Sequence, residues 1–163
     1  MRVPEVDAQG HVTLKERVLD VQVPKGILPG QTIRLAGQGA PPLSAQGTAG
    51  DLYLEVEFQP HPRYRVEGRD LYLELPVAPW EAALGASVKC PTPKGTVDLK
   101  IPAGSRAGTK LRLKERGIPA SPPGDLYLVL EIALPEASTE KAKSAYRAMA
   151  DSLPFNARTS LGV

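Results

Sequence analysis

The chain has 163 residues, with 20 Lys and Arg against 18 Asp and Glu, giving a formal net charge of +2. That length fits one domain or two small ones, and so small a charge does not by itself indicate a nucleic-acid partner. The sequence contains no long apolar run, no signal-peptide pattern and only one cysteine, Cys90. A membrane span, secretion and an internal disulfide are therefore not expected, and we predict a cytoplasmic protein.

A long repeat organises the chain. The segment Val21–Gly39 (VQVPKGILPGQTIRLAGQG) returns as Leu99–Gly117 (LKIPAGSRAGTKLRLKERG), and each copy leads to GDLY, at Gly50–Tyr53 and Gly124–Tyr127. Self-similarity of this length marks duplicated structural units. The repeat therefore predicts two related domains followed by a C-terminal helix and tail. The boundaries we assign are residues 1–60, 61–137 and 138–163.

Short stretches that alternate apolar and polar residues predict half-buried strands. In chain order they are Val12–Leu14, Leu19–Val23, Thr32–Leu35, Asp51–Phe58, Asp70–Leu75, Ser87–Lys89, Thr96–Ile101, Lys110–Leu113 and Asp125–Leu134. The chain also has 17 prolines and 15 glycines, which favour turns over long helices. This pattern predicts an all-β fold, with two tandem β-sandwich-like domains of related topology.

Each copy of the repeat predicts the same local path. A strand ends at Pro24 or Pro102, because proline cannot donate to a strand ladder. Pairs of glycines then allow the positive φ of a tight reversal, at Gly26 and Gly30 and at Gly104 and Gly108. Between the domains, residues 59–65 (QPHPRYR) contain two prolines, which predicts a stiff connector.

Two helices are expected in the second half. Pro79–Gly85 (PWEAALG) begins with a proline, which the first helical turn tolerates, and stops at glycine. A second helix, about Ser138 to Leu153, ends before Pro154. Its apolar residues share one stripe, namely Ala142, Ala145, Tyr146, Met149 and Leu153. That stripe could pack on its own domain or pair with a second copy of the chain.

The sequence offers little for an enzyme or a metal site. The two histidines, His11 and His61, lie in turn-like sequence, and Cys90 has no histidine near it in the sequence. Asp51 and Asp125 follow glycine at matching positions of the repeat, which favours a structural role in bonding turn amides over a catalytic or metal-binding one. We therefore predict a non-enzymatic protein without a cofactor.

A basic stripe distinguishes the second copy. Lys110, Arg112 and Lys114 recur at period two, so all three project from one face of a strand. The matching residues of the first copy are Thr32, Arg34 and Ala36. The stripe fits a solvated strand face protected from edge pairing, or a contact to phosphate or an acidic peptide.

An apolar edge distinguishes the first copy. Leu19, Val21 and Val23 share one face of a predicted strand near the N-terminal edge. Such an edge can belong to a sandwich core, or it can receive an extended peptide as an added strand. The residues alone leave both alternatives open.

The motif string itself resembles a known family. VPKG, PGQTIRLAGQG, GDLYLEVEFQPHPRYRVEGRDLYLELPVAPWEAALGASV, PTPKGTVDLKIPAGSRAGTKLRLKERG and the second GDLY resemble the C-terminal substrate-binding region of DnaJ-type co-chaperones. The similarity runs from about Val3 to Leu153, and VAPWEAALGA and LPFNAR are closest to the curved DNA-binding protein A branch. The family's J-domain signature and Gly/Phe-rich linker are not in this sequence, and the missing cysteine-rich module indicates the zinc-free class. The similarity begins near the end of the family's first strand, so one wall of the first groove is expected to be truncated.

The resemblance implies two β-rich domains, a shallow peptide groove on the first, and a homodimer formed through the C-terminal helix. It implies binding of non-native polypeptides, delivery to a DnaK-type chaperone, and DNA binding with a nucleoid location as the alternative. The residues it assigns are Val3, Leu19 and Val21 for peptide, Lys15, Arg17 and Thr32 for the chaperone's acidic tail, Lys110, Arg112 and Lys114 for DNA, and Ala142, Tyr146, Met149 and Leu153 for dimerisation.

Overall fold

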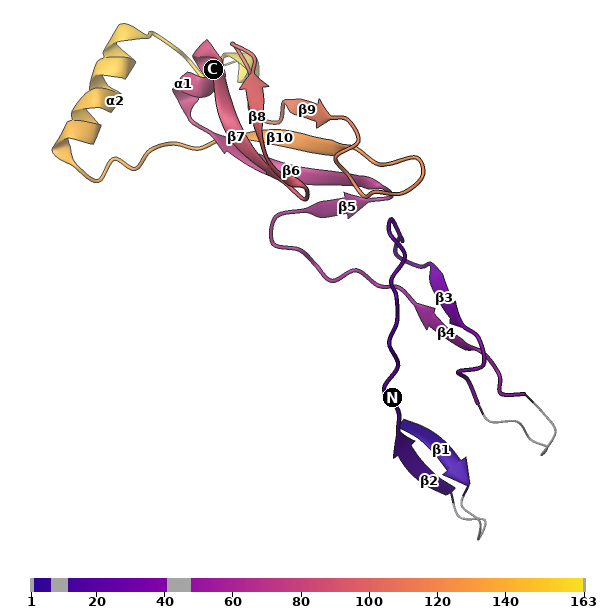
Figure 1. Ribbon diagram of the computed structural model, residues 1–163. Helices are drawn as coiled ribbons and strands as arrows, with labels where there is room; N and C mark the ends of the chain where they lie inside the picture. Colours follow the sequence, from indigo (N-terminus) through magenta and orange to yellow (C-terminus); the bar gives the residue numbers. More distant parts are fainter. Residues whose placement is uncertain (1, 7–11, 41–47, 163) are drawn as a thin grey trace.

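The computed structural model describes residues 2–6, 12–40 and 48–162, and within them it is built mainly of short strands (Figure 1). The elements in chain order are β1 (Arg2–Val6), β2 (Val12–Glu16), β3 (Thr32–Leu35), β4 (Leu52–Glu55), β5 (Arg65–Glu67), β6 (Asp70–Val77), α1 (Pro79–Leu84), β7 (Ala86–Thr92), β8 (Gly95–Ile101), β9 (Lys110–Leu113), β10 (Leu126–Ile132), α2 (Glu140–Ser152) and the 3-10 turn η1 (Thr159–Leu161). The all-β prediction is confirmed, as are both predicted helices.

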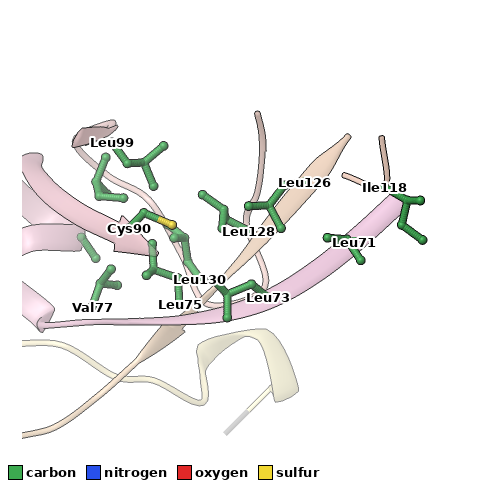
Figure 2. Close-up of a cluster of buried hydrophobic side chains, with 12 residues drawn as sticks. Leu71, Leu73, Leu75, Val77, Cys90, Leu99, Ile118, Leu126, Leu128 and Leu130 are labelled. Carbon is green, nitrogen blue, oxygen red and sulfur yellow. The ribbon is translucent and has the colours of Figure 1, made fainter. Parts of the chain in front are cut away.

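The second half contains the hydrophobic core. Its main sheet has the strand order β5-β6-β10-β9, with β6 and β10 parallel and in register from Leu71–Leu126 to Val77–Ile132. Alternate residues of these two strands are buried: Leu71, Leu73, Leu75, Val77, Leu126, Leu128 and Leu130. The β7–β8 hairpin covers this face and adds Cys90, Leu99 and Ile101 (Figure 2). A sheet and a hairpin therefore enclose one core, as in a sandwich.

Local sequence explains both helices. At the start of α1, the side chain of Glu81 accepts a 2.8 Å hydrogen bond from the Ala78 backbone N–H, which satisfies a free donor of the first turn. The Thr139 side chain caps α2 by accepting from the Ala142 N–H at 3.1 Å. Helix α2 contains no buried residue and stands away from the sheets in Figure 1. Its apolar stripe is therefore not covered by the rest of the described chain.

The first half is more open. β3 pairs with β4, and β1 pairs with β2 in a separate two-stranded sheet. No residue from Glu16 to Asp70 is buried among those whose side chains the structure describes. Two contacts join this half to the second. Leu28 packs against the core, and a Cβ on Gly26 would lie 2.6 Å from the Ala120 Cα, so only glycine allows this approach.

One strand prediction was wrong and two strands were missed. Residues 17–24 belong to no strand. The predicted alternation is present at Leu19 and Val21, which are half-buried, but it ends at Val23, which is exposed. The matching segment of the second copy, β8, pairs with the strand before it, whereas β2 pairs with β1 and leaves residues 17–24 without a ladder partner. The missed strands, β1 and β5, are short and carry a proline or flanking charges that obscure alternation. The division into domains stays a prediction.

Candidate functional site: binding surfaces of the two repeat copies

Both copies of the repeat contain the same carboxylate clamp. Asp51 accepts a 2.6 Å hydrogen bond from the Arg34 Nε and a 2.9 Å bond from the Gly37 backbone N–H. Asp125 accepts from the Arg112 Nε at 2.6 Å and from the Glu115 N–H at 2.8 Å. Each aspartate therefore ties a turn to the strand that precedes it, which confirms the structural role predicted for both.

The clamps fix the charge of these aspartates. The N–H of Gly37 and then the Arg34 guanidinium lower the pKa of Asp51. For Asp125 the Glu115 N–H is the main cause that lowers the pKa, ahead of the Arg112 guanidinium, while partial desolvation opposes both. Both carboxyl groups are therefore ionised at neutral pH, and each one offsets the charge of an arginine.

This pairing changes the interpretation of the basic stripe. Residues 110–113 alternate exposed and half-buried, so Lys110 and Arg112 do lie on the outer face as predicted. Arg112, however, is paired with Asp125, just as Arg34 is paired with Asp51 in the first copy. An arginine at this position is therefore common to both copies of the repeat. Within the stripe, only Lys110 and Lys114 are cations that the first copy lacks.

A row of cations and aromatic rings crosses the outer face of the main sheet. The register aligns Arg65, Tyr72, Tyr127 and Arg112 on four adjacent strands. The two tyrosine rings stack with centroids 5.1 Å apart, and the Arg65 guanidinium lies 4.7 Å from the Tyr72 centroid. Lys110 lies 5.8 Å from the same ring. These contacts hold Arg65 and Lys110 over the Tyr72 ring by cation–π attraction, so both cations already have a partner within the sheet.

Sequence reasoning missed this row, although a signal for it exists. The tripeptide Asp-Leu-Tyr occurs three times, at residues 51–53, 70–72 and 125–127. The last two begin the parallel strands β6 and β10, where they lie side by side. The Asp125 N–H donates to Asp70 at 2.8 Å, which ties the two starts together. The additional Asp-Leu-Tyr at residues 70–72 therefore marks the strand, β6, that pairs with β10.

The predicted peptide surface lies on an extended segment. Leu19 and Val21 are half-buried, while Val23 is 63% exposed and Val18 is 89% exposed. The β1–β2 register pairs Val3 with Lys15, but the side chains of both lie outside the described residues. Arg17 and Thr32 are exposed. The structure therefore places Leu19 and Val21 on one side of a segment whose backbone is in no ladder.

A separate apolar groove lies between Leu28 and the segment that connects β4 to β5. The groove has a volume of about 640 Å³ and is lined mainly by apolar side chains, among them Leu28, Phe58, Tyr64 and Val66. The connector that borders it is fixed by His61, whose Nδ1 accepts from the N–H groups of Arg63 and Tyr64 at 3.1 and 3.3 Å. A hydrogen-bonded turn thus adds to the rigidity predicted from the prolines.

The predicted dimerisation stripe is exposed. Met149 and Leu153 are 51% and 60% exposed, while Ala142 and Tyr146 are half-buried. The Tyr146 hydroxyl donates to the Pro135 carbonyl at 2.6 Å, which fastens the helix to the segment before it. Helix α2 therefore has an anchored orientation and an uncovered apolar side.

The described residues show no catalytic or metal-binding constellation. They contain no group of three His, Cys, Asp or Glu that could hold a metal, and none of their helices is long and apolar enough to span a membrane. Cys90 is fully buried, and this burial raises the pKa of its thiol. The other histidine, His11, lies outside the described residues.

Comparison with known proteins identifies the family. The family model described as the DnaJ C terminal domain matches residues 4–135. The chain therefore belongs to the DnaJ C-terminal domain family, a region of DnaJ-type co-chaperones and not a class of enzymes. This agrees with the resemblance found in the sequence and with the duplicated β-rich units of the structure.

Curated relatives narrow the branch. The chain is 49% identical over 162 residues to the curved DNA-binding protein of Coxiella burnetii, which covers 99% of this chain and 51% of that protein. It is 41% identical over 161 residues to the curved DNA-binding protein of Pseudomonas putida, which covers 97% and 50%. The chain thus spans about half the length of the curated relatives it matches.

Proposed function

We propose that this chain is the part of a DnaJ-type co-chaperone that binds non-native polypeptides and presents them to a DnaK-type chaperone. The observation that carries the proposal is the extended segment 17–24, where Leu19 and Val21 share one side and the backbone is in no ladder. A client can add there as a strand, with main-chain bonds for affinity and apolar side chains for selectivity. The groove lined by Leu28 and Phe58 is a second apolar surface that a longer client could contact.

The test is a pair of charge substitutions with a matched control. We expect Leu19→Asp and Val21→Asp each to weaken binding of a fluorescein-labelled Leu- and Phe-rich peptide at least about tenfold, because filling an apolar pocket contributes about 1.5–3 kcal/mol. Val18→Asp makes the same kind of change on the exposed side of the segment, and its affinity should stay within about twofold of the parent's. Equal anisotropy titrations for Val21→Asp and Val18→Asp would refute the surface.

The chaperone's tail would bind beside this surface. Carboxylates of an acidic peptide would contact Arg17 and Lys15, and Thr32, which is exposed on the strand β3, is the third residue assigned to the tail. Exposed ion pairs of this kind typically contribute only about 0–1 kcal/mol, so the tail should bind weakly and in a salt-dependent way. An acidic peptide that binds Arg17→Glu as well as it binds the parent would contradict this assignment.

We also propose that α2 pairs two copies of the chain through Ala142, Tyr146, Met149 and Leu153. The uncovered apolar side of the helix supports this, and two linked grooves would gain affinity for one client through effective concentration. Met149→Glu with Leu153→Glu should convert the dimer to a monomer in light scattering, because both charges would be buried in the interface. Ser144→Glu, on the opposite side of α2, should remain dimeric. A monomeric parent would disprove the pairing.

A second candidate function is DNA binding. The curated relatives named above are called curved DNA-binding proteins, and the second domain carries exposed cations that the first copy of the repeat lacks. Nucleic acid would then be a second partner, beside non-native polypeptide. If DNA is a ligand, its affinity should fall steeply with salt, since each phosphate contact releases counterions.

A further inference from the structure

The loop between β9 and β10, residues 114–124, is a rigid platform at the end of the second domain that faces the first. Its own backbone closes through the bonds from the Gly117 N–H to the Gly124 carbonyl and from the Gly124 N–H to the Ile118 carbonyl, both 2.9 Å. The Ile118 N–H donates to the Arg69 carbonyl at 2.9 Å, and the Ile118 side chain is buried. The backbone positions from which side chains project are therefore fixed by hydrogen bonds.

Four cations gather on this platform from three separate turns. Lys114 and Arg116 belong to the loop itself. Lys94, in the β7–β8 turn, donates to the Glu115 carbonyl at 3.3 Å, and Arg69, in the β5–β6 turn, donates to the Pro122 carbonyl at 3.4 Å. We call Arg69, Lys94, Lys114 and Arg116 the cationic loop cluster. Lys25 of the first domain lies close by, since the adjacent Gly26 approaches Ala120.

The nearby carboxylates leave this cluster with an excess of positive charge. Asp125 is engaged by Arg112, Asp70 accepts from the Asp125 N–H, and Glu67 is paired with Arg65. Asp70 bonds only to a neutral N–H and keeps its charge, so among the described residues Asp70 and Glu115 oppose the four cations. Arg69 and Lys94 donate to neutral carbonyls and therefore keep their full charge. None of the four cations forms an ion pair within the part of the chain that the structure describes, whereas Arg112 of the β9 stripe is paired with Asp125.

The first copy of the repeat shows that the turn does not require these charges. Where the second copy has Lys114, Glu115 and Arg116, the first has Ala36, Gly37 and Gln38. Glu115 has a φ of +57°, a conformation that favours glycine, and the first copy does place Gly37 there, at +66°. The same carboxylate clamp forms in both copies. The cations are thus an addition to a shared scaffold, not part of it.

We infer that the cationic loop cluster contacts the phosphate backbone of nucleic acid, an inference that rests on the second candidate function. Lysine and arginine side chains on adjacent turns suit a run of phosphates, because backbone contacts need charge and hydrogen-bond donors but no reading of bases. Lys110 and Arg112, committed to a tyrosine ring and to Asp125, contribute less. The contact surface is therefore shifted from the β9 stripe to the loop, with Lys114 common to both.

Titration of the 163-residue chain with labelled duplex DNA at several salt concentrations tests this inference. The variant R69S/K94S/K114S/R116S should bind more weakly, and its slope of log affinity against log salt should be shallower by up to about 3–4, since each phosphate contact contributes about 0.9. The control K89S/K100S/R106S/K141S removes the same charge elsewhere on the exposed surface and should retain the parent's slope. K114S/R116S, which leaves both interloop hydrogen bonds in place, should lose about half as much slope.

The outcomes are separable. If the two quadruple variants lose affinity equally, net charge alone governs binding and the site is wrong. A parent that binds DNA with a slope unchanged in the cluster variant also overturns the site, but leaves the second candidate function standing. No binding by the parent at low salt would remove both, while the apolar-peptide titrations would still decide client binding. If the cluster variant lost binding of an acidic peptide but kept its binding of DNA, the cluster would be a site for a protein partner instead.

Discussion

We expect Gly124→Ala to be among the most damaging single substitutions in this chain. A Cβ at residue 124 would overlap the carbonyl group of Arg69, which is backbone and cannot rotate away. The start of β10 would have to separate from the turn before β6, although these strands carry the core leucines and the Ile118–Arg69 hydrogen bond joins the loop before β10 to that turn. Overpacking against fixed atoms typically costs about 1–3 kcal/mol, and contact with backbone on this scale should cost about 3 kcal/mol or more.

The repeat supplies a matched control for this substitution. Gly50 is the equivalent of Gly124 in the first copy, yet among the described residues the nearest atom to a Cβ there would be the Ala40 carbonyl oxygen at 3.8 Å. Gly50→Ala should therefore change the free energy of unfolding by no more than about 0.5 kcal/mol. Urea denaturation followed by circular dichroism measures both changes. Equal midpoints for the two variants would mean that the close approach at Gly124 does not constrain the fold.

Leu128→Ala should be comparably severe, for a different reason. The side chain is fully buried, and the register places it between Leu73 on β6 and Leu111 on β9. Removing a buried leucine side chain costs about 2–5 kcal/mol, because transfer energy is lost and a cavity remains. The same experiment on the equivalent Leu54, which is only half-buried, should give less than about 2 kcal/mol. A larger loss of unfolding free energy for Leu54→Ala than for Leu128→Ala would mean that the main core does not lie in the second half.

The two halves of the chain differ in how much apolar surface they bury. The second half has a buried core, whereas the described side chains of residues 16–70 are at most half-buried. Regions with few buried apolar contacts open at low free energy, so β3 and β4 should exchange amide hydrogens faster than β6 and β10. The proposed client surface thus lies on the more adaptable half, and the cationic loop cluster lies on the rigid one.

Much of the fold followed from short windows of sequence. The repeat, its prolines and glycines and the Asp-Leu-Tyr motif predicted matching turns, and the structure shows positive φ at Gly26, Gly30, Gly104 and Gly108. Alternation located most of the strands, and the sequence also predicted where α1 begins and stops and that α2 ends before Pro154. The role of Asp51 and Asp125 in bonding turn amides was also predicted. Such features depend on residues close together in the chain, so local sequence determines them.

Only the tertiary structure decided which segments pair and which charges meet. The parallel pairing of β6 with β10 joins segments about 55 residues apart. The β1–β2 pairing and the Arg112–Asp125 clamp join nearer segments, but strand alternation names neither partner. The same holds for the loop where Arg69 and Lys94 join Lys114 and Arg116. Alternation predicts which face of a strand each side chain lies on, but it does not predict which strand lies beside it, because several neighbouring strands are compatible with the same pattern. Partners are chosen by packing of the whole domain, and with them the surfaces available for binding.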